Sequence, residues 1–95
     1  MVTIIAYEAG SFDGKGTVVK LFAVEGTDAL RRWAIAAGLP SHWLHADHFD
    51  LWGKRTYILL RRDDVHLVPP AKGQAMHAAM RAVERNQGDS AARGV

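Results

Sequence analysis

Residues 41–50 gather the side chains of this chain that are best suited to chemistry. Their sequence, Ser-His-Trp-Leu-His-Ala-Asp-His-Phe-Asp, holds three of the five histidines and two of the ten acidic residues. Imidazole and carboxylate groups bind metal ions, transfer protons near neutral pH and contact phosphate groups. No second cluster elsewhere in the sequence completes a recognised catalytic set. The segment therefore indicates where a site should lie without identifying its reaction.

The leading hypothesis for this region is a phosphate-binding site. His48 and Asp50 alternate, and alternate residues of an extended segment share a face. Asp50 would orient or charge the imidazole of His48, and the cations Lys54 and Arg55 would attract a phosphate group. Trp43 would stack against a base. The sequence thus predicts a small binding module whose ligand is nucleic acid, a nucleotide or another phosphorylated molecule.

A metal-dependent hydrolase is the alternative from a different class of protein. His42, His45, His48 and Asp50 would be its ligands, with Asp47 or Asp50 as the base and a divalent ion such as zinc as the cofactor. Without cysteine, any metal must take nitrogen and oxygen ligands. The spacing His42-x-x-His45 is a weak signal without a placed third ligand, and the sequence has no His-Glu-x-x-His motif. The leading hypothesis needs no cofactor.

Two plainer interpretations stay open. In the first, Asp50 pairs with Arg55 and His48 caps a backbone carbonyl, so that the segment is a polar turn without a ligand. In the second, the protein is an interaction module that forms a homodimer through a sheet edge or through its methionine-containing closing helix. If a ligand does bind, Trp52 offers a second stacking ring.

The composition describes one small globular domain. The chain has 95 residues, of which 48% are apolar and 23% charged, and a net charge of +2. No apolar run is long enough to span a membrane, and the N-terminus lacks the features of a signal peptide, so we expect a cytoplasmic protein without membrane contact. The chain carries three pairs of adjacent basic residues, or basic doublets, which are Arg31-Arg32, Lys54-Arg55 and Arg61-Arg62. A surface that binds nucleic acid would require these three doublets to lie on one face of the protein.

The pattern of apolar and turn-forming residues predicts an α+β fold. Two β-branched runs, residues 2–7 and 17–24, predict strands that pair across a glycine-containing loop. Apolar residues at helical spacing predict helices over residues 28–37 and 71–85, and a short strand is expected at 65–68. Because each helix has one apolar stripe, we expect a two-layer domain with a short, mostly antiparallel sheet and helices on one face.

The boundaries and the middle of the chain are less sharply defined by the sequence. We expect one domain over residues 1–86 and a flexible C-terminal tail over 87–95. Residues 49–60 fit a hairpin that turns at Gly53-Lys54, but residues 54–62 also fit a helix that starts after Gly53. Four consecutive apolar residues satisfy both patterns, so periodicity does not decide between them.

Several of these motifs occur together in a known order. Residues 28–39 form the first helix, Asp47-His48-Phe49-Asp50-Leu51 is followed by Lys54-Arg55, and Gln74-Ala75-Met76 lies in the closing helix. In this order the chain resembles, over about residues 2–85, the short bacterial and phage proteins catalogued as domain of unknown function 4031. The resemblance implies a small α/β protein, favours a helix after Lys54-Arg55, and implies no established activity.

The chain departs from that family at three places. The spacing from Asp50 to Lys54 is one residue shorter than in the family pattern. The first strand of family members often ends in two aspartates where this chain has Tyr7-Glu8, and their second strand tends to carry a histidine where this chain has Leu21-Phe22-Ala23. If those positions belong to the family's site, this chain has lost them.

Overall fold

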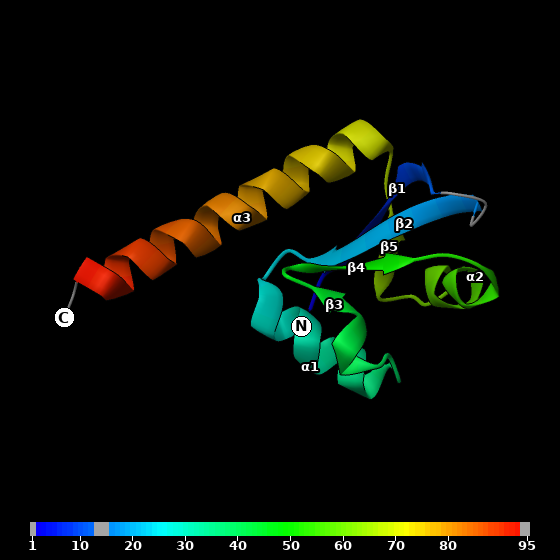
Figure 1. Ribbon diagram of the computed structural model, residues 1–95, viewed down its shortest axis with the longest axis horizontal. Coiled ribbons are helices and arrows are strands. Elements are labelled where there is room, and N and C mark those ends of the chain that lie inside the picture. Colours follow the sequence, from blue (N-terminus) through cyan, green and yellow to red (C-terminus); the bar gives the residue numbers. More distant parts are fainter. Residues whose placement is uncertain (1, 13–15, 94–95) are drawn as a thin grey trace.

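The computed structural model describes residues 2–12 and 16–93, and they form one mixed five-stranded sheet with three α-helices (Figure 1). The strands lie in the order β3-β4-β2-β1-β5, and every neighbouring pair is antiparallel except β1 and β5. The elements are β1 (Ile4–Phe12), β2 (Gly16–Ala23), α1 (Thr27–Ala36), the 3-10 turn η1 (Ser41–Trp43), β3 (Leu44–His45), β4 (His48–Leu51), α2 (Lys54–Leu60), β5 (Val65–Leu67) and α3 (Pro70–Arg93). The predicted α+β class and the mostly antiparallel sheet are confirmed.

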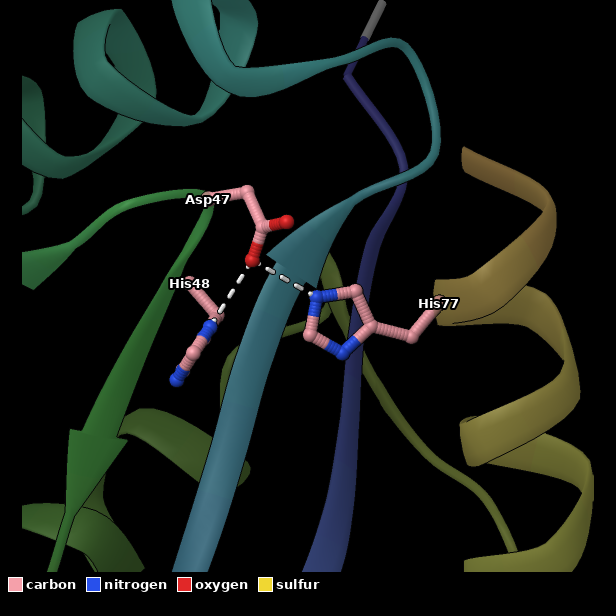
Figure 2. Close-up of side chains that lie close together, drawn as sticks. All are labelled: Asp47, His48 and His77. Carbon is pink, nitrogen blue, oxygen red and sulfur yellow. Dashed lines mark hydrogen bonds and ion pairs between the residues drawn. The ribbon is translucent and has the colours of Figure 1, made fainter. Parts of the chain in front are cut away.

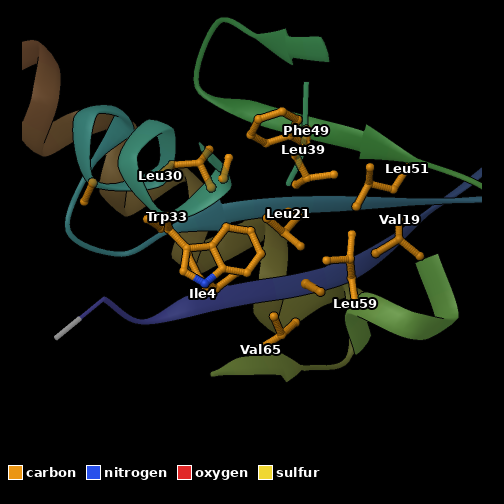
Figure 3. Close-up of a cluster of buried hydrophobic side chains, with 14 residues drawn as sticks. Ile4, Val19, Leu21, Leu30, Trp33, Leu39, Phe49, Leu51, Leu59 and Val65 are labelled. Atoms are coloured by element: carbon orange, nitrogen blue, oxygen red, sulfur yellow. The ribbon is translucent and has the colours of Figure 1, made fainter. Parts of the chain in front are cut away.

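The helices cover both faces of the sheet, which corrects the expected two-layer arrangement. Ile4 and Ala6 of β1 pack in a large cluster with α1 and α2 (Figure 3), whereas Ile5 and Tyr7 pack with Met80 of α3 on the other face. The sheet is therefore the middle of three layers. The physical reason lies in β1 itself, because a run of consecutive apolar residues is typical of a strand that is buried on both faces.

Residues 49–60 divide into a strand and a helix. Strand β4 ends at Leu51, and α2 begins at Lys54 directly after Gly53, whose φ of 82° favours glycine. The helical alternative is therefore correct for the second half of the segment. The helix α2 buries Thr56 and Leu59.

Helix α3 is longer than expected and approaches β1 closely. Its backbone is helical through Arg93, where the sequence predicts an unstructured tail. Its C-terminal half runs past the end of the sheet (Figure 1), and the chain measures 46 × 27 × 24 Å. None of the helices in the described part of the chain is both long and apolar enough to cross a membrane.

At the N-terminal end of α3, Gly73 lies against the side chain of Tyr7.

The packing of Trp33 gives a first test of the core. Trp33 is 8% exposed and its Nε1–H donates to Asp64 Oδ2 at 2.8 Å, whereas Ile35 on the same helix is 65% exposed. Trp33→Ala should lower the free energy of unfolding by about 3–5 kcal/mol, because it empties a filled core site. Ile35→Ala is the control and should change it by less than about 0.5 kcal/mol. Urea unfolding measures both, and similar losses in the two variants would contradict this packing.

The contact at Gly73 gives a second test. A Cβ atom added at Gly73 would lie 2.4 Å from Cβ of Tyr7, so α3 would have to move away from β1. Alanine normally stabilises a helix relative to glycine by about 1 kcal/mol. Gly73→Ala should nevertheless destabilise the protein, by about 1–3 kcal/mol, as overpacked cores do. The control is Gln74→Ala at the neighbouring exposed position, and a Gly73→Ala protein as stable as wild type would refute the close approach.

Candidate functional site

A pocket of about 510 Å³ opens beside η1 and β4. Its volume falls in the range of about 300–1,000 Å³ that small-molecule sites occupy. Apolar and aromatic side chains dominate its wall, and a few polar groups interrupt them. The lining residues are Val18, His42, Trp43, His45, Asp50, Leu51, Trp52 and Arg55. All but Val18 come from residues 42–55, the part of the sequence that was expected to carry the site.

The structure brings most of the predicted phosphate site together. Trp43, Asp50 and Arg55 line the pocket, whereas Lys54 does not. His48 lies next to this wall, with its Nε2 3.4 Å from Asp50 Oδ1. Three of the five predicted binding residues thus share one pocket, and a fourth touches one of them.

The polar groups of the pocket are arranged around two indole rings. Trp43 is 36% exposed and Trp52 is 47% exposed. The guanidinium carbon of Arg55 lies 5.4 Å from the centre of the Trp43 ring. Over residues 2–12 and 16–93 Arg55 forms no ion pair, so the Asp50–Arg55 pair of the ligand-free interpretation does not form. The cation is left facing the pocket.

Asp50 carries an unsatisfied acceptor. Its Oδ1 is buried and has no hydrogen-bond partner within the described residues, because the nearby Nε2 of His48 is not aligned for a hydrogen bond. A buried oxygen without a donor costs about 1–3 kcal/mol. The nearest donor that could remove that cost is a proton on Nε2 of His48, 3.4 Å away.

The carboxylate of Asp47 connects two segments that are far apart in the sequence (Figure 2). Asp47 lies in the two-residue turn between β3 and β4, next to Ala46, whose φ of 56° is left-handed. Its Oδ1 lies 2.8 Å from Nδ1 of His48 and 3.0 Å from Nε2 of His77. Nε of Arg81 donates to its Oδ2 at 2.7 Å. We call Asp47, His48, His77 and Arg81 the Asp47 cluster.

The protonation states of this cluster follow from its surroundings. Burial alone would raise the pKa of Asp47, but hydrogen bonds from Arg81, His48 and His77 outweigh it and hold that pKa well below its ordinary value. Burial lowers the pKa of His77, although its hydrogen bond to Asp47 opposes the shift. Burial raises the pKa of Tyr7. At neutral pH Asp47 is therefore ionised, His77 is neutral and Tyr7 keeps its proton.

These states fix the direction of each hydrogen bond. An ionised carboxylate only accepts, so Nε2–H of His77 and Nδ1–H of His48 both donate to Asp47. Nδ1 of the neutral His77 then accepts from the hydroxyl of Tyr7 at 2.7 Å. The Nε2 atom of a neutral His48 is left with its lone pair, on the side of Asp50.

The Asp47 cluster also contains the one group of three metal-binding side chains in the described part of the chain, Asp47, His48 and His77. Nitrogen and oxygen donors of this kind suit zinc. However, Oδ1 of Asp47 already accepts from both histidines and from Nη2 of Arg81 at 3.2 Å. The guanidinium group of Arg81 also places its positive charge next to the carboxylate of Asp47, where it would repel a metal cation. The donor set therefore favours a hydrogen-bonded cluster over a metal centre, and His42 and His45 do not belong to it.

Two of the remaining basic residues form ion pairs outside the pocket. Arg31 pairs with Asp28 at 2.9 Å, and Arg62 pairs with Asp64 at 2.9 Å. Of the three basic doublets, only Arg55 lines the pocket. The pocket therefore contains one basic residue from these doublets, and the doublets do not form an extended basic surface through the pocket.

Two aromatic residues of β1 and β2 lie against His77. The ring of Phe22 stacks on the imidazole, with centroids 4.5 Å apart and planes 8° apart, and Tyr7 makes the hydrogen bond described above. His77 and Arg81 were not found from the sequence. The available signal was their spacing of four residues on the helical face that also carries Met76 and Met80.

Comparisons of the chain with models of known protein families, with curated proteins and with solved structures find no match. The resemblance noted from the sequence therefore stays a prediction, and the function has to be argued from the site.

The Asp47 cluster leads to a test of stability against pH. Because the pKa of Asp47 is lower in the folded protein than in the unfolded chain, its contribution is complete above about pH 4 and is lost as the pH falls further. Asp47→Asn should lower the free energy of unfolding at pH 7 by about 1.5–3 kcal/mol, as the loss of charged hydrogen bonds does. The difference from wild type should shrink below about pH 4.

The control is Asp63→Asn, at an exposed turn position. Urea unfolding at several pH values between about 3 and 7 measures the effect. A difference between Asp47→Asn and wild type that stays constant over this range would show that the charge of Asp47 does not stabilise the fold.

Proposed function

We propose that the protein binds a nucleobase that carries a phosphate group, as part of a nucleotide or of a single-stranded nucleic acid, in the pocket lined by Trp43, Trp52, Asp50 and Arg55. The observation that carries the proposal is the presence in one pocket of two partly exposed indole rings, a cation without an ion pair in the described chain, and a carboxylate side chain. Each of these groups fits a different part of such a ligand.

The aromatic part of the ligand is suggested by the two tryptophans. An indole ring at the surface stacks on any nucleobase, because every base has a π face, and each stacking contact contributes about 1–3 kcal/mol. Trp43 and Trp52 line the same pocket with much of their surface exposed. The third tryptophan, Trp33, lies in the core and takes no part.

The polar edge of the base is suggested by Asp50. Exocyclic amino groups and ring N–H groups of nucleobases are donors, and the carboxylate side chain of Asp50 in the pocket wall is an acceptor. A base that donates to this side chain gains a hydrogen bond to a charged group. Asp50 therefore favours a base over a plain aromatic ring without donors.

The phosphate is suggested by Arg55 and the neighbouring histidines. A guanidinium group binds phosphate through paired N–H donors, and no carboxylate of the described residues neutralises Arg55. His42 and His45 line the same pocket and add positive charge when they are protonated. Lys54, next to Arg55 but outside the lining, adds to the local field.

Substitutions in the pocket test the proposal. Trp43→Ala and Trp52→Ala should each weaken the binding of a labelled single-stranded oligonucleotide by about 1–3 kcal/mol. Arg55→Ala should weaken it and reduce the slope of log K against log salt by about one phosphate contact. Fluorescence anisotropy at low salt measures these affinities, with nucleoside monophosphates as competitors.

The matched control is Tyr57→Ala, which removes an aromatic ring that is 69% exposed on α2 and does not line the pocket. It should leave the affinity unchanged. An absence of binding by wild type to DNA, RNA and mononucleotides at low salt would refute the proposed function. Equal losses for Tyr57→Ala and Trp43→Ala would move the ligand away from the pocket.

A further inference from the structure

His48 has the arrangement of a general base next to the pocket, beside the lining residue Asp50. Its Nδ1–H donates to the ionised Asp47 at 2.8 Å, which fixes the orientation of the ring and leaves the lone pair on Nε2. A carboxylate that holds an imidazole in this way also stabilises the imidazolium that forms when the base takes a proton. The side chain of His48 is 12% exposed, and its Nε2 lies 3.4 Å from the pocket residue Asp50.

The unsatisfied oxygen of Asp50 is explained by the same role. When Nε2 of His48 gains a proton, it becomes a donor beside Asp50 Oδ1, which has no other partner within the described residues. The imidazolium would then lie between two carboxylates, Asp47 and Asp50. The surroundings of the ring therefore suit its protonated form after a proton transfer.

A second histidine stands on the other strand of the hairpin. His45 and His48 are directly opposite in the register of β3 and β4, so their side chains lie on the same face. Their rings are nearly parallel, at 15°, with centroids 6.1 Å apart. His45 lines the pocket and can supply a proton where His48 removes one.

The pocket lacks a hydroxyl, thiol or amine nucleophile among the residues that the structure describes, because its lining there includes no serine, threonine, cysteine, lysine or tyrosine. Its histidines and Asp50 are suited to moving protons and to holding charge. A reaction that uses a nucleophile from the substrate fits this set of side chains. RNA carries such a nucleophile, the ribose 2′-hydroxyl, next to the phosphate that it attacks.

We propose that the pocket cleaves single-stranded RNA without a metal ion, with His48 as the general base and His45 as the general acid. Nε2 of His48 takes the proton of the 2′-hydroxyl, and the 2′-oxygen forms a bond to the adjacent phosphorus. The bond from phosphorus to the 5′-oxygen breaks, its electron pair stays on that oxygen, and protonated His45 gives it a proton. The products are a 2′,3′-cyclic phosphate and a 5′-hydroxyl, and proton exchange with water restores both histidines.

Arg55 and the tryptophans position the substrate for this step. The guanidinium of Arg55 stabilises the negative charge that builds up on the phosphate oxygens in the transition state and offsets the repulsion by Asp50. Stacking on Trp43 and Trp52 holds the bases on either side of the scissile phosphate. The inference rests on the proposed function, because the RNA must first bind in this pocket.

The test uses three end-labelled oligonucleotides of one base sequence: all RNA, all DNA, and DNA with a single ribonucleotide. Wild-type protein in EDTA should cleave the first at many positions and the third only after its ribonucleotide, leaving a cyclic phosphate. It should bind the DNA without cleaving it. His48→Ala and His45→Ala should each lower the cleavage rate by about 10²–10⁴-fold, which is the usual contribution of a general acid or base.

His66→Ala is the matched control, because His66 is an exposed histidine of β5 at the opposite edge of the sheet, and it should cleave at the wild-type rate. His48 belongs to the Asp47 cluster, so its variant is also checked for folding by circular dichroism. His45 is exposed and its side chain makes no hydrogen bond to another side chain of residues 2–12 and 16–93, so His45→Ala keeps the test valid if His48→Ala does not fold.

The outcomes separate this inference from the proposed function. RNA that binds with pocket-dependent affinity but stays intact would overturn the inference and leave the binding function standing. Equal cleavage by wild type and His45→Ala would identify a contaminating nuclease and would overturn the inference. Cleavage that EDTA abolishes would also overturn the inference. An absence of binding to every oligonucleotide would overturn both proposals.

Discussion

The carboxylate of Asp47 is the group on which the arrangement of this protein depends. It belongs to a turn near one edge of the sheet, yet its partners His77 and Arg81 come from α3, 30 and 34 residues later in the sequence. Helix α3 contacts β1 more than it contacts any other element. The Asp47 cluster extends that attachment across β2 to the β3–β4 hairpin, so one ionised side chain links the outer helix to the strands beside the pocket.

The same carboxylate connects the interior with the pocket through a chain of polar groups. The hydroxyl of Tyr7 donates to His77, His77 and His48 donate to Asp47, and His48 approaches Asp50. Because Asp47 can only accept, each imidazole has a defined tautomer. An imidazole on a mobile surface loop would sample both tautomers. The hydrogen bond to Asp47 therefore fixes which ring nitrogen of His48 is directed toward Asp50.

Local patterns in the sequence were sufficient for the part of the site that is local. Trp43, Asp50 and Arg55 were predicted from thirteen consecutive residues, because residues that are close in the sequence are also close in space. His77 has no such local signal, and its bond to Asp47 depends on where α3 docks. That docking was itself mispredicted, because Ile5 and Tyr7 were not recognised as a second buried face of β1. Local periodicity carries no information on which face a distant helix will cover.

The turn at Ala46 has a consequence for how the protein acquires its final shape. A left-handed backbone at a residue other than glycine is unfavourable by about 1–2 kcal/mol, and two-stranded hairpins are at best marginally stable alone. The β3–β4 hairpin therefore depends on contacts outside itself, among them the hydrogen bonds of Asp47 with His77 and Arg81. The hairpin cut out as a peptide would lose its structure, because the residues that hold its turn belong to a helix about 30 residues later in the sequence.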